Sequence, residues 1–156
     1  MRGLLVCLVI CVSVTATAKA AGGAYLCIGD HAVGFSFDNN SKQWIETSFK
    51  PHKYIVRKAK PSEFNNNAEN RPNLWIVEEF GEKLPVAFCD DGFKGNFLDC
   101  KLFLHFEMNR QNMRFNTWYL IGYVDDLEID PKSKKWRKAP EGSDTPYMEI
   151  GKCSPV

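Results

Sequence analysis

The chain has 156 residues, of which 20 are basic, 19 are acidic and 13% are aromatic. This balance of charge argues against nucleic acid or anionic lipid as the main partner, because both attract proteins with a strong excess of basic residues. The length suits one domain with a hydrophobic core, and we expect a single β-rich domain over residues 21–156.

The first twenty residues have the pattern of a secretory signal peptide. Arg2 precedes an apolar run over residues 4–14, and the tripeptides 16–18 and 18–20 are small-x-small cleavage sites. Removal of residues 1–20 would leave 18 basic against 19 acidic residues. An uncleaved N-terminal anchor is the alternative, although the apolar run is short for a membrane helix. We expect a periplasmic or secreted protein with no membrane span after signal cleavage.

Short apolar runs alternate with turn signals along the first half of the exported part. Runs rich in β-branched and aromatic residues, bounded by turn residues, are typical of strands. These runs are residues 24–28, 32–37, 43–49, 53–57, 74–80 and 86–89. The segment 60–73 is polar and rich in Asn and Pro, so we expect a long surface loop there, with room for one helical turn begun by Ser62.

The stretch FDNNSKQW (37–44) stands between two of these runs. Asp and Asn bond their own backbone, so DNNS favours a turn, with Phe37 and Trp44 packed across the hairpin. The stretch IDPKSKKW (129–136) repeats the pattern, and FEMNRQNMRF (106–115) is a looser third copy. We interpret them as three hairpins of one design. A calcium loop is the other interpretation, but the spacing, central glycine and closing Glu of an EF-hand are missing.

The second half continues with strand-like runs at residues 102–108, 117–124 and 146–153. Between them, the segment 130–146 is charged and interrupted by prolines, which indicates a second surface excursion. Eight or nine strands with short links are typical of an all-β fold. We expect an antiparallel meander, closed as a small barrel or folded as a sandwich, and stapled by disulfides.

Four cysteines remain after the expected signal cleavage: Cys27, Cys89, Cys100 and Cys153. An even number in an exported chain indicates disulfides, and four cysteines allow three pairings. We favour Cys89–Cys100, because glycines between them allow a tight return, and Cys27–Cys153, which would tie the start of the domain to its end. No Cys-x-x-Cys pair favours zinc, and we expect no metal site and no cofactor.

The sequence shows no catalytic motif. His31, His52 and His105 stand in no Ser-His-Asp, His-Glu-x-x-His or Cys-His context, and we interpret His105 as an ordinary strand histidine. Carboxylate pairs such as Asp90-Asp91 point to opposite faces of a strand, so they make no acid–base couple by themselves. We expect a protein that is not an enzyme and has no catalytic residue. An uncharacterised hydrolase stays as an alternative for which no nucleophile can be named.

Exposed aromatic rings are the first candidates for binding a partner. Of the tryptophans, we expect Trp44 and Trp118 to pack in hairpins or in the core, whereas Trp136 lies in the charged segment and is the best candidate for an exposed ring. The expected function is that of an exported non-catalytic β domain, whose partner is an unknown protein or glycan of the cell envelope.

Both ends of the exported part resemble a group of small exported proteins of alphaproteobacteria. The stretches that carry the resemblance are YLCIGDHAVGFSFDNNSKQWIETSFKPHKYIVRK (25–58) and DTPYMEIGKCSPV (144–156). The resemblance implies a bacterial, periplasmic setting and no assigned activity.

A weaker resemblance is to periplasmic inhibitors of c-type lysozyme, which are small β-barrels with Tyr-x-Cys near the mature start and a Ser-Gly-x-x-Tyr inhibitory loop. Here Tyr25-Leu26-Cys27 matches the start, and Ser143 and Tyr147 match the loop. Asp144 stands where the glycine is expected, and Asp tolerates the backbone geometry of glycine poorly. The resemblance implies lysozyme inhibition as an alternative function, with Ser143 and Tyr147 as binding residues.

Overall fold

The structure is a computed structural model, and it describes residues 23–60, 63, 74–124, 127–129, 136–138, 142 and 144–156. The expected signal peptide, most of the expected loop 60–73 with Ser62, and Ser143 lie outside the described residues. Within the described ranges, a search for helices able to cross a membrane finds none.

The described elements are eleven strands and one helical turn. The strands are β1 (Tyr25–Asp38), β2 (Gln43–Phe49), β3 (Lys53–Lys58), β4 (Trp75–Glu79), β5 (Pro85–Cys89), β6 (Phe97–Leu102), β7 (His105–Asn109), β8 (Arg114–Tyr119), β9 (Leu127–Ile129), β10 (Trp136–Lys138) and β11 (Tyr147–Pro155), and the helical turn is α1 (Ile121–Val124).

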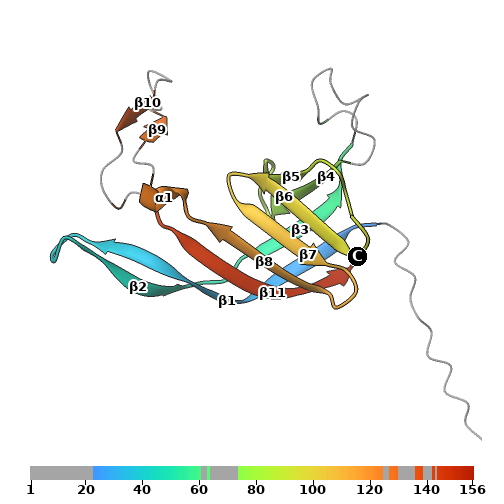
Figure 1. Ribbon diagram of the computed structural model, residues 1–156, viewed down its shortest axis with the longest axis horizontal. Helices are drawn as coiled ribbons and strands as arrows, with labels where there is room; N and C mark the ends of the chain where they lie inside the picture. Colours follow the sequence, from blue (N-terminus) through green and yellow to red (C-terminus); the bar gives the residue numbers. More distant parts are fainter. Residues whose placement is uncertain are drawn as a thin grey trace, which may run out of the picture.

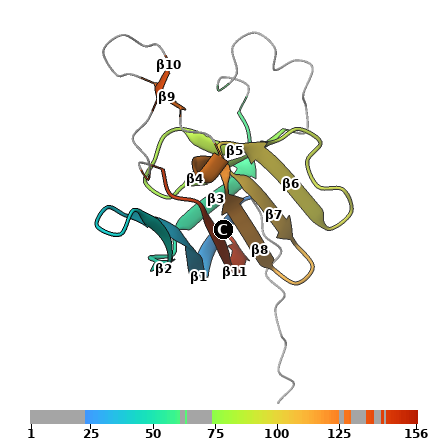
Figure 2. The ribbon, with the colours of Figure 1, turned by 60° about the vertical axis from the view of Figure 1, so that its left-hand side comes forward.

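Eight antiparallel strands close into a barrel in the order β1-β3-β4-β5-β6-β7-β8-β11 (Figures 1 and 2). Strand β11 pairs with β8 on one side and with β1 on the other, and this second pairing closes the ring. Closure removes the unpaired edges that an open sheet would expose. The prediction of an all-β antiparallel fold is confirmed, and of the two closures considered the barrel is the one that forms.

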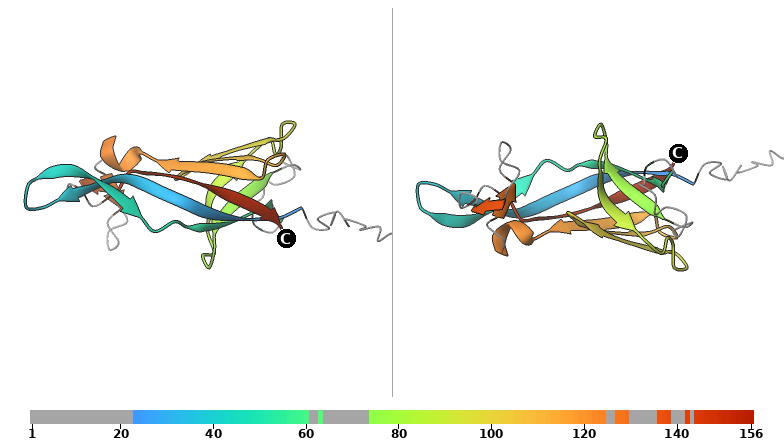
Figure 3. Two further views of the ribbon diagram at one scale, coloured as in Figure 1. Left: turned by 90° about the horizontal axis from the view of Figure 1, so that it is seen from below. Right: turned by 90° about the horizontal axis from the view of Figure 1, so that it is seen from above.

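Strand β1 is longer than its neighbours and serves two parts of the fold. Residues Tyr25–Ile28 pair with β3 inside the ring, whereas Ala32–Asp38 pair with β2. The β1–β2 hairpin projects beyond the barrel as an arm (Figure 3). The sequence analysis expected separate strands at 24–28 and 32–37; the structure instead has one strand with an irregularity in the β11 register between Gly29 and His31.

Aromatic and aliphatic side chains fill the barrel because every second residue of each strand points inward. The ring of Phe106 stacks on that of Phe115, with centroids 5.2 Å apart, and Tyr54 contacts both rings edge-on at 5.7 Å. Other buried core residues include Val56, Trp75, Val77, Ala87, Leu98 and Met108. This packing makes the interior a solid core over most of its length.

Both predicted disulfides are confirmed. Cys27 on β1 lies opposite Cys153 on β11 in the strand register, and the two sulfur atoms are bonded. Cys89 at the end of β5 is bonded to Cys100 on β6. All four cysteines are buried, so the bridges belong to the core.

The stretch FDNNSKQW forms the predicted hairpin loop between β1 and β2. The Asp38 carboxylate accepts hydrogen bonds from the Asn40 backbone N–H at 3.0 Å and from the Ser41 hydroxyl at 2.7 Å. These bonds, the one from Ser41 first, lower the pKa of Asp38. Phe37 and Trp44 are opposite each other in the register, with ring centroids 5.6 Å apart. The turn interpretation is therefore confirmed for this stretch.

The other two copies of the pattern also join antiparallel pairs. Between β7 and β8, the side-chain oxygens of Asn109 and Asn112 accept backbone N–H bonds from Gln111 and Arg114. In the second copy, Trp136 of β10 pairs with Ile129 of β9, while the residues between them lie outside the described part of the chain.

Two of the predicted runs are broken or shortened by a turn in the structure. The run 102–108 is broken by a tight turn at Phe103, whose ring is exposed, so β6 ends at Leu102 and β7 begins at His105. The expected strand 117–124 ends at Tyr119, and α1 follows. Periodicity alone missed both breaks because the apolar letters continue through the turns.

Candidate functional site at the mouth of the barrel

A pocket of about 550 Å³ opens where β2 and β8 end and β3 and β11 begin. We call it the mouth pocket, and its lining residues are Phe49, Lys50, His52, Tyr119, Asp144, Thr145 and Tyr147. Barrel mouths are frequent ligand sites because loops and strand ends can bring polar side chains to an apolar floor.

Strand alternation carries polar side chains to this end of the barrel interior. On β11, Tyr147 and Glu149 have the same parity as Cys153, which is buried in the core. On β8, Tyr119 has the same parity as Phe115 and Thr117, which are buried. The inward row of each strand thus changes from apolar in the core to polar at the mouth.

Glu149 is fully buried beneath the mouth pocket. Its Oε1 accepts a hydrogen bond from the His52 backbone N–H at 2.9 Å, and its Oε2 contacts His52 Nδ1 at 2.9 Å and the Tyr54 hydroxyl at 3.2 Å. A carboxylate is retained in such a position only when its oxygens are satisfied, since an unpaired buried charge is very costly. The His52 backbone N–H, the His52 ring and the Tyr54 hydroxyl together provide hydrogen bonds to both oxygens of Glu149.

Gly29 makes room for the buried carboxylate. A Cβ atom added at this position would lie 1.8 Å from Glu149 Oε1 and 2.7 Å from the Pro51 Cβ. The irregularity of β1 falls at this residue, and the Gly29 backbone N–H donates to the His52 carbonyl at 3.0 Å. The wall of the barrel is therefore shaped around Glu149 and the segment that carries His52.

His52 is oriented by its contact with Glu149. When Nδ1 donates to the carboxylate, Nε2 is the free ring nitrogen, and it lies 3.9 Å from Glu79 Oε1. The imidazole also packs against the ring of Tyr147, with centroids 5.6 Å apart. In this tautomer the neutral ring offers Nε2 as an acceptor for a hydrogen bond from a ligand in the pocket.

The two buried phenols at the mouth are held in the protonated form. Burial is the main cause that raises the pKa of both Tyr54 and Tyr147, and the charge of Glu149 adds to it. Their hydroxyls therefore act as neutral hydrogen-bonding groups at physiological pH.

Asp144 completes the polar lining on the opposite side. Its Oδ2 accepts a hydrogen bond from the Tyr119 hydroxyl, and its Oδ1 accepts one from the Thr145 backbone N–H at 3.0 Å. The rings of Tyr119 and Phe49 flank Tyr147, with centroid distances of 6.3 and 6.4 Å. One aromatic wall and one carboxylate thus face the same space.

The site combines a histidine oriented by a carboxylate with a lining of rings and polar side chains. The Glu149–His52 pair resembles the orienting half of a catalytic triad, in which a carboxylate fixes a histidine. The described residues that line the pocket include neither serine nor cysteine beside His52. Hydrogen bonding and ring contact are the chemistry that this lining supports.

The predicted binding residues are distributed unevenly with respect to the pocket. Tyr147 lines it, Ser143 lies outside the described residues, and Trp136 begins β10, with its side chain outside what the structure describes. Trp44 packs in the arm, as expected, and Trp118 lies against His105 with centroids 3.9 Å apart.

Sequence reasoning missed His52, Tyr119, Asp144 and Glu149 as site residues. One signal was present for Glu149, which has the parity of Tyr147 and Cys153 in YMEIGKC, and a carboxylate in a core row is unusual. For His52 there was no comparable signal, because its role depends on a partner 97 residues away.

A second hollow, of about 480 Å³, lies between the arm and α1. Phe35, Trp44, Leu120, Tyr123, Val124 and Pro146 line it. Tyr123 and Val124 are 65% and 84% exposed, and the lining of this hollow is more apolar than that of the mouth pocket.

Comparisons of this chain with models of protein families, with characterised proteins and with solved structures find no match. The interpretation of the site therefore rests on the chain's own residues.

Proposed function

We propose that the protein is an exported, non-catalytic binding domain of the bacterial envelope, and that the mouth pocket holds a saccharide unit of an envelope glycan. The observation that carries this proposal is the lining of the pocket, where rings, a carboxylate, an imidazole and an ammonium group surround about 550 Å³. Small-ligand pockets commonly measure roughly 300–1,000 Å³.

The chemistry of a sugar ring matches this lining. The C–H face of a pyranose is apolar and can pack on the rings of Tyr119 and Tyr147, while its hydroxyl groups can donate to Asp144. Lys50 offers a donor to ring, hydroxyl or acetamido oxygens, and Nε2 of His52 offers an acceptor to a sugar hydroxyl. Aromatic contact and convergent polar groups together provide both affinity and orientation.

The supporting network favours binding because it holds the lining in place. His52 is fixed by two hydrogen bonds to Glu149, and Asp144 is fixed by bonds from Tyr119 and Thr145. Side chains that are already ordered lose less conformational entropy when a ligand binds.

An exported, periplasmic location is part of the proposal. Two disulfides support it, since such bridges persist in oxidising compartments and are rare in the bacterial cytoplasm. The signal-like segment at residues 1–20 supports it in the same direction.

Calorimetric titration tests the proposal. Purified protein is titrated with soluble peptidoglycan fragments and with N-acetylglucosamine oligosaccharides, and we expect saturable binding to at least one of them. Tyr147→Ala and Asp144→Asn should each weaken binding about tenfold or more, as expected for losing a ring contact or a charged hydrogen bond. Tyr123→Ala is the matched control, because Tyr123 lies outside the mouth pocket. Absence of binding at millimolar saccharide, or equal affinity in all three variants, would contradict the proposal.

Inhibition of c-type lysozyme is the second candidate. The closed barrel and the bonding of Cys27, which ends the Tyr-x-Cys start, favour it. The matching loop contributes Asp144 and Tyr147 to the mouth pocket, where Tyr147 packs against His52. Addition of micromolar protein to a cell-wall lysis assay decides: inhibition that Tyr147→Ala abolishes supports this candidate, and unchanged lysis ends it.

Hydrolysis is the third possibility, and the binding experiment can exclude it directly. After the titration, the saccharides are analysed by mass spectrometry, and we expect them to be intact. Cleavage that depends on His52 would instead assign a catalytic role to the Glu149–His52 pair.

A further inference from the structure

Three potential metal ligands converge on the outer face of the barrel wall. Asp99 on β6 and His105 and Glu107 on β7 each offer one ligand atom, and these atoms lie within 4.8 Å of one another. His105 Nε2 is 2.6 Å from Asp99 Oδ1 and 3.7 Å from Glu107 Oε1. The sequence analysis expected no metal site, because no sequence motif joins these residues. Only the pairing of β6 with β7 brings them together.

The strand register makes this arrangement unfavourable without a cation. Asp99 lies directly opposite Glu107 on paired strands, and like charges in such positions repel each other. Positive charge can come from a protonated His105, from Lys101, whose Nζ is 3.3 Å from Asp99 Oδ2, or from a bound ion. A histidine nitrogen between two carboxylates fits an ion pair and a bound ion alike, and metal titration separates the two.

We propose that Asp99, His105 and Glu107 bind a divalent transition-metal ion, with Zn²⁺ as the best match. Zinc accepts one imidazole nitrogen and carboxylate oxygens at about 2.0–2.2 Å, so tetrahedral ligand atoms lie roughly 3.3 Å apart. The two distances of 2.6 and 3.7 Å lie on either side of that separation. Water completes the coordination, since the site has three protein ligands and is open to solvent.

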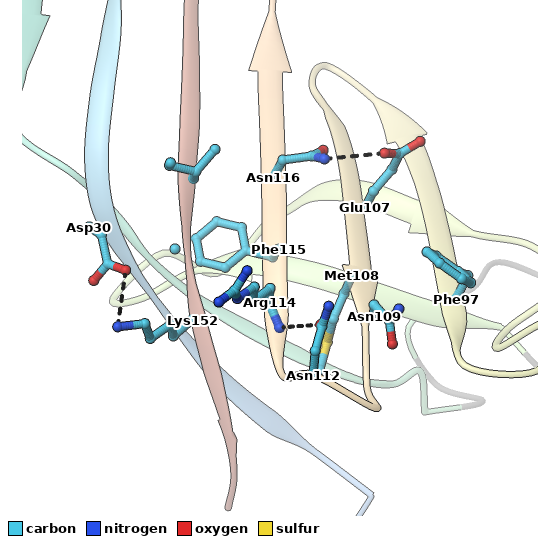
Figure 4. A pocket seen from close by; sticks show the side chains of 12 residues that line it. Asp30, Phe97, Glu107, Met108, Asn109, Asn112, Arg114, Phe115, Asn116 and Lys152 are labelled. Atoms are coloured by element: carbon cyan, nitrogen blue, oxygen red, sulfur yellow. Dashed lines mark hydrogen bonds and ion pairs between the residues drawn. The ribbon is translucent and has the colours of Figure 1, made fainter.

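Neighbouring side chains orient two of the three ligands. The Trp118 ring packs on the His105 imidazole at a centroid distance of 3.9 Å. The Asn116 amide donates from Nδ2 to Glu107 Oε2 at 3.3 Å (Figure 4). The other carboxylate oxygen, Oε1, is the one that lies 3.7 Å from His105 Nε2. Groups that hold ligands in this way commonly contribute about 10–100-fold to metal affinity.

Asn116 also supplies an observation independent of the three ligands. Its Oδ1 is buried and has no hydrogen-bond partner in the described part of the chain. Buried polar atoms in native proteins nearly always have a partner, so this oxygen calls for a donor that the described residues do not provide. A water molecule can be that donor, and an ion bound beside Glu107, to which Asn116 Nδ2 donates, can hold such a water.

Zinc titration of the purified protein, stripped with a chelator, tests this site. We expect one Zn²⁺ per chain by calorimetry, and His105→Ala and Asp99→Asn should each weaken binding at least about tenfold. His31→Ala is the matched control, because His31 is an exposed strand histidine on β1. Glu107→Gln is a further ligand variant should His105→Ala fail to fold, as judged by circular dichroism.

Lys101→Ala separates a metal site from a simple ion pair. Removal of the ammonium group takes away a competing cation, so zinc affinity should rise if the carboxylate of Asp99 is a metal ligand. No binding at millimolar Zn²⁺, or equal affinity in the His105→Ala and His31→Ala variants, would overturn the proposal and leave an ion pair only.

Discussion

Glu149 and the two phenols beside it set the chemistry of the mouth. The carboxylate has no exposed surface, and Tyr54 donates to it at 3.2 Å. Burial raises the pKa of Tyr54 and of Tyr147, so both hydroxyls keep their protons where an exposed phenol would begin to lose its own. Because the folded protein holds these two protons more tightly than the unfolded chain does, ionisation of the phenols affects the free energy of unfolding.

We predict that the free energy of unfolding falls as the pH rises above 10. In the unfolded chain both phenols return to a pKa of 10.0, whereas in the folded protein their pKa values are higher. Above pH 10 the unfolded state therefore binds fewer protons than the folded state, and stability is lost with increasing pH. Below pH 10 this contribution is fully present.

Thermal unfolding followed by circular dichroism between pH 8 and 11.5 measures this effect. The pH dependence should be smaller in Tyr54→Phe, which removes one ionisable phenol, and unchanged in Tyr123→Phe, since Tyr123 is 65% exposed. The same slope in both variants would refute the assignment.

Strand β1 has an irregularity next to Gly29, where the strand makes room for the buried carboxylate of Glu149. Strand β1 continues on either side of Gly29, pairing with β3 before it and with β2 after it. The side chains of Glu149 and Pro51 occupy the space that any larger residue at position 29 would need. The residue that β1 can carry at position 29 therefore depends on the side chains of Pro51 and Glu149, which come from distant parts of the chain.

We predict that Gly29→Ala lowers the free energy of unfolding by about 1–3 kcal/mol, the usual cost of overpacking. The loss should be smaller in a Glu149→Ala background, because the closest of the clashing groups is then absent. Urea unfolding of the single and double variants gives the coupling, with exposed Ser48→Ala as the control. Additive losses would mean that Glu149 is not what restricts position 29.

Closure of the whole molecule depends on the pairing of its first and last strands. The Cys27–Cys153 bond joins β1 to β11 across a sequence separation of 126, whereas Cys89–Cys100 spans a separation of 11. A cross-link removes more conformational freedom from the unfolded chain when it closes a longer loop. The terminal bridge should therefore stabilise the barrel more.

We predict that replacing both cysteines of the terminal bridge by alanine costs about 5 kcal/mol, against about 3 kcal/mol for the short bridge. Both pairs are buried, so the two double variants lose comparable core packing. Urea unfolding under non-reducing conditions compares them. An equal or larger loss for the Cys89→Ala/Cys100→Ala variant would show that loop length does not determine the difference.

Local features of the fold could be predicted because neighbouring residues determine them. The loop 38–42 follows from side-chain bonds of Asp38 to residues two and three positions away. Strand alternation was clear in β3, where Tyr54 and Val56 are the buried residues. It was missed in β6, where Asp99 and Lys101 alternate with the buried Leu98 and Cys100. The signal peptide at 1–20 and the domain bounds 21–156 stay predictions.

The sequence by itself determined the all-β class and the turn chemistry, and it left three disulfide pairings open, of which the favoured one is present in the structure. Only the tertiary structure decided that the sheet closes as a barrel and that His52 meets Glu149 from 97 residues away. It also decided that Asp99 faces His105 across a strand pair. The physical reason is that turns and alternation arise from adjacent residues, whereas a site arises from strand register and closure, which the energetics of the whole core select.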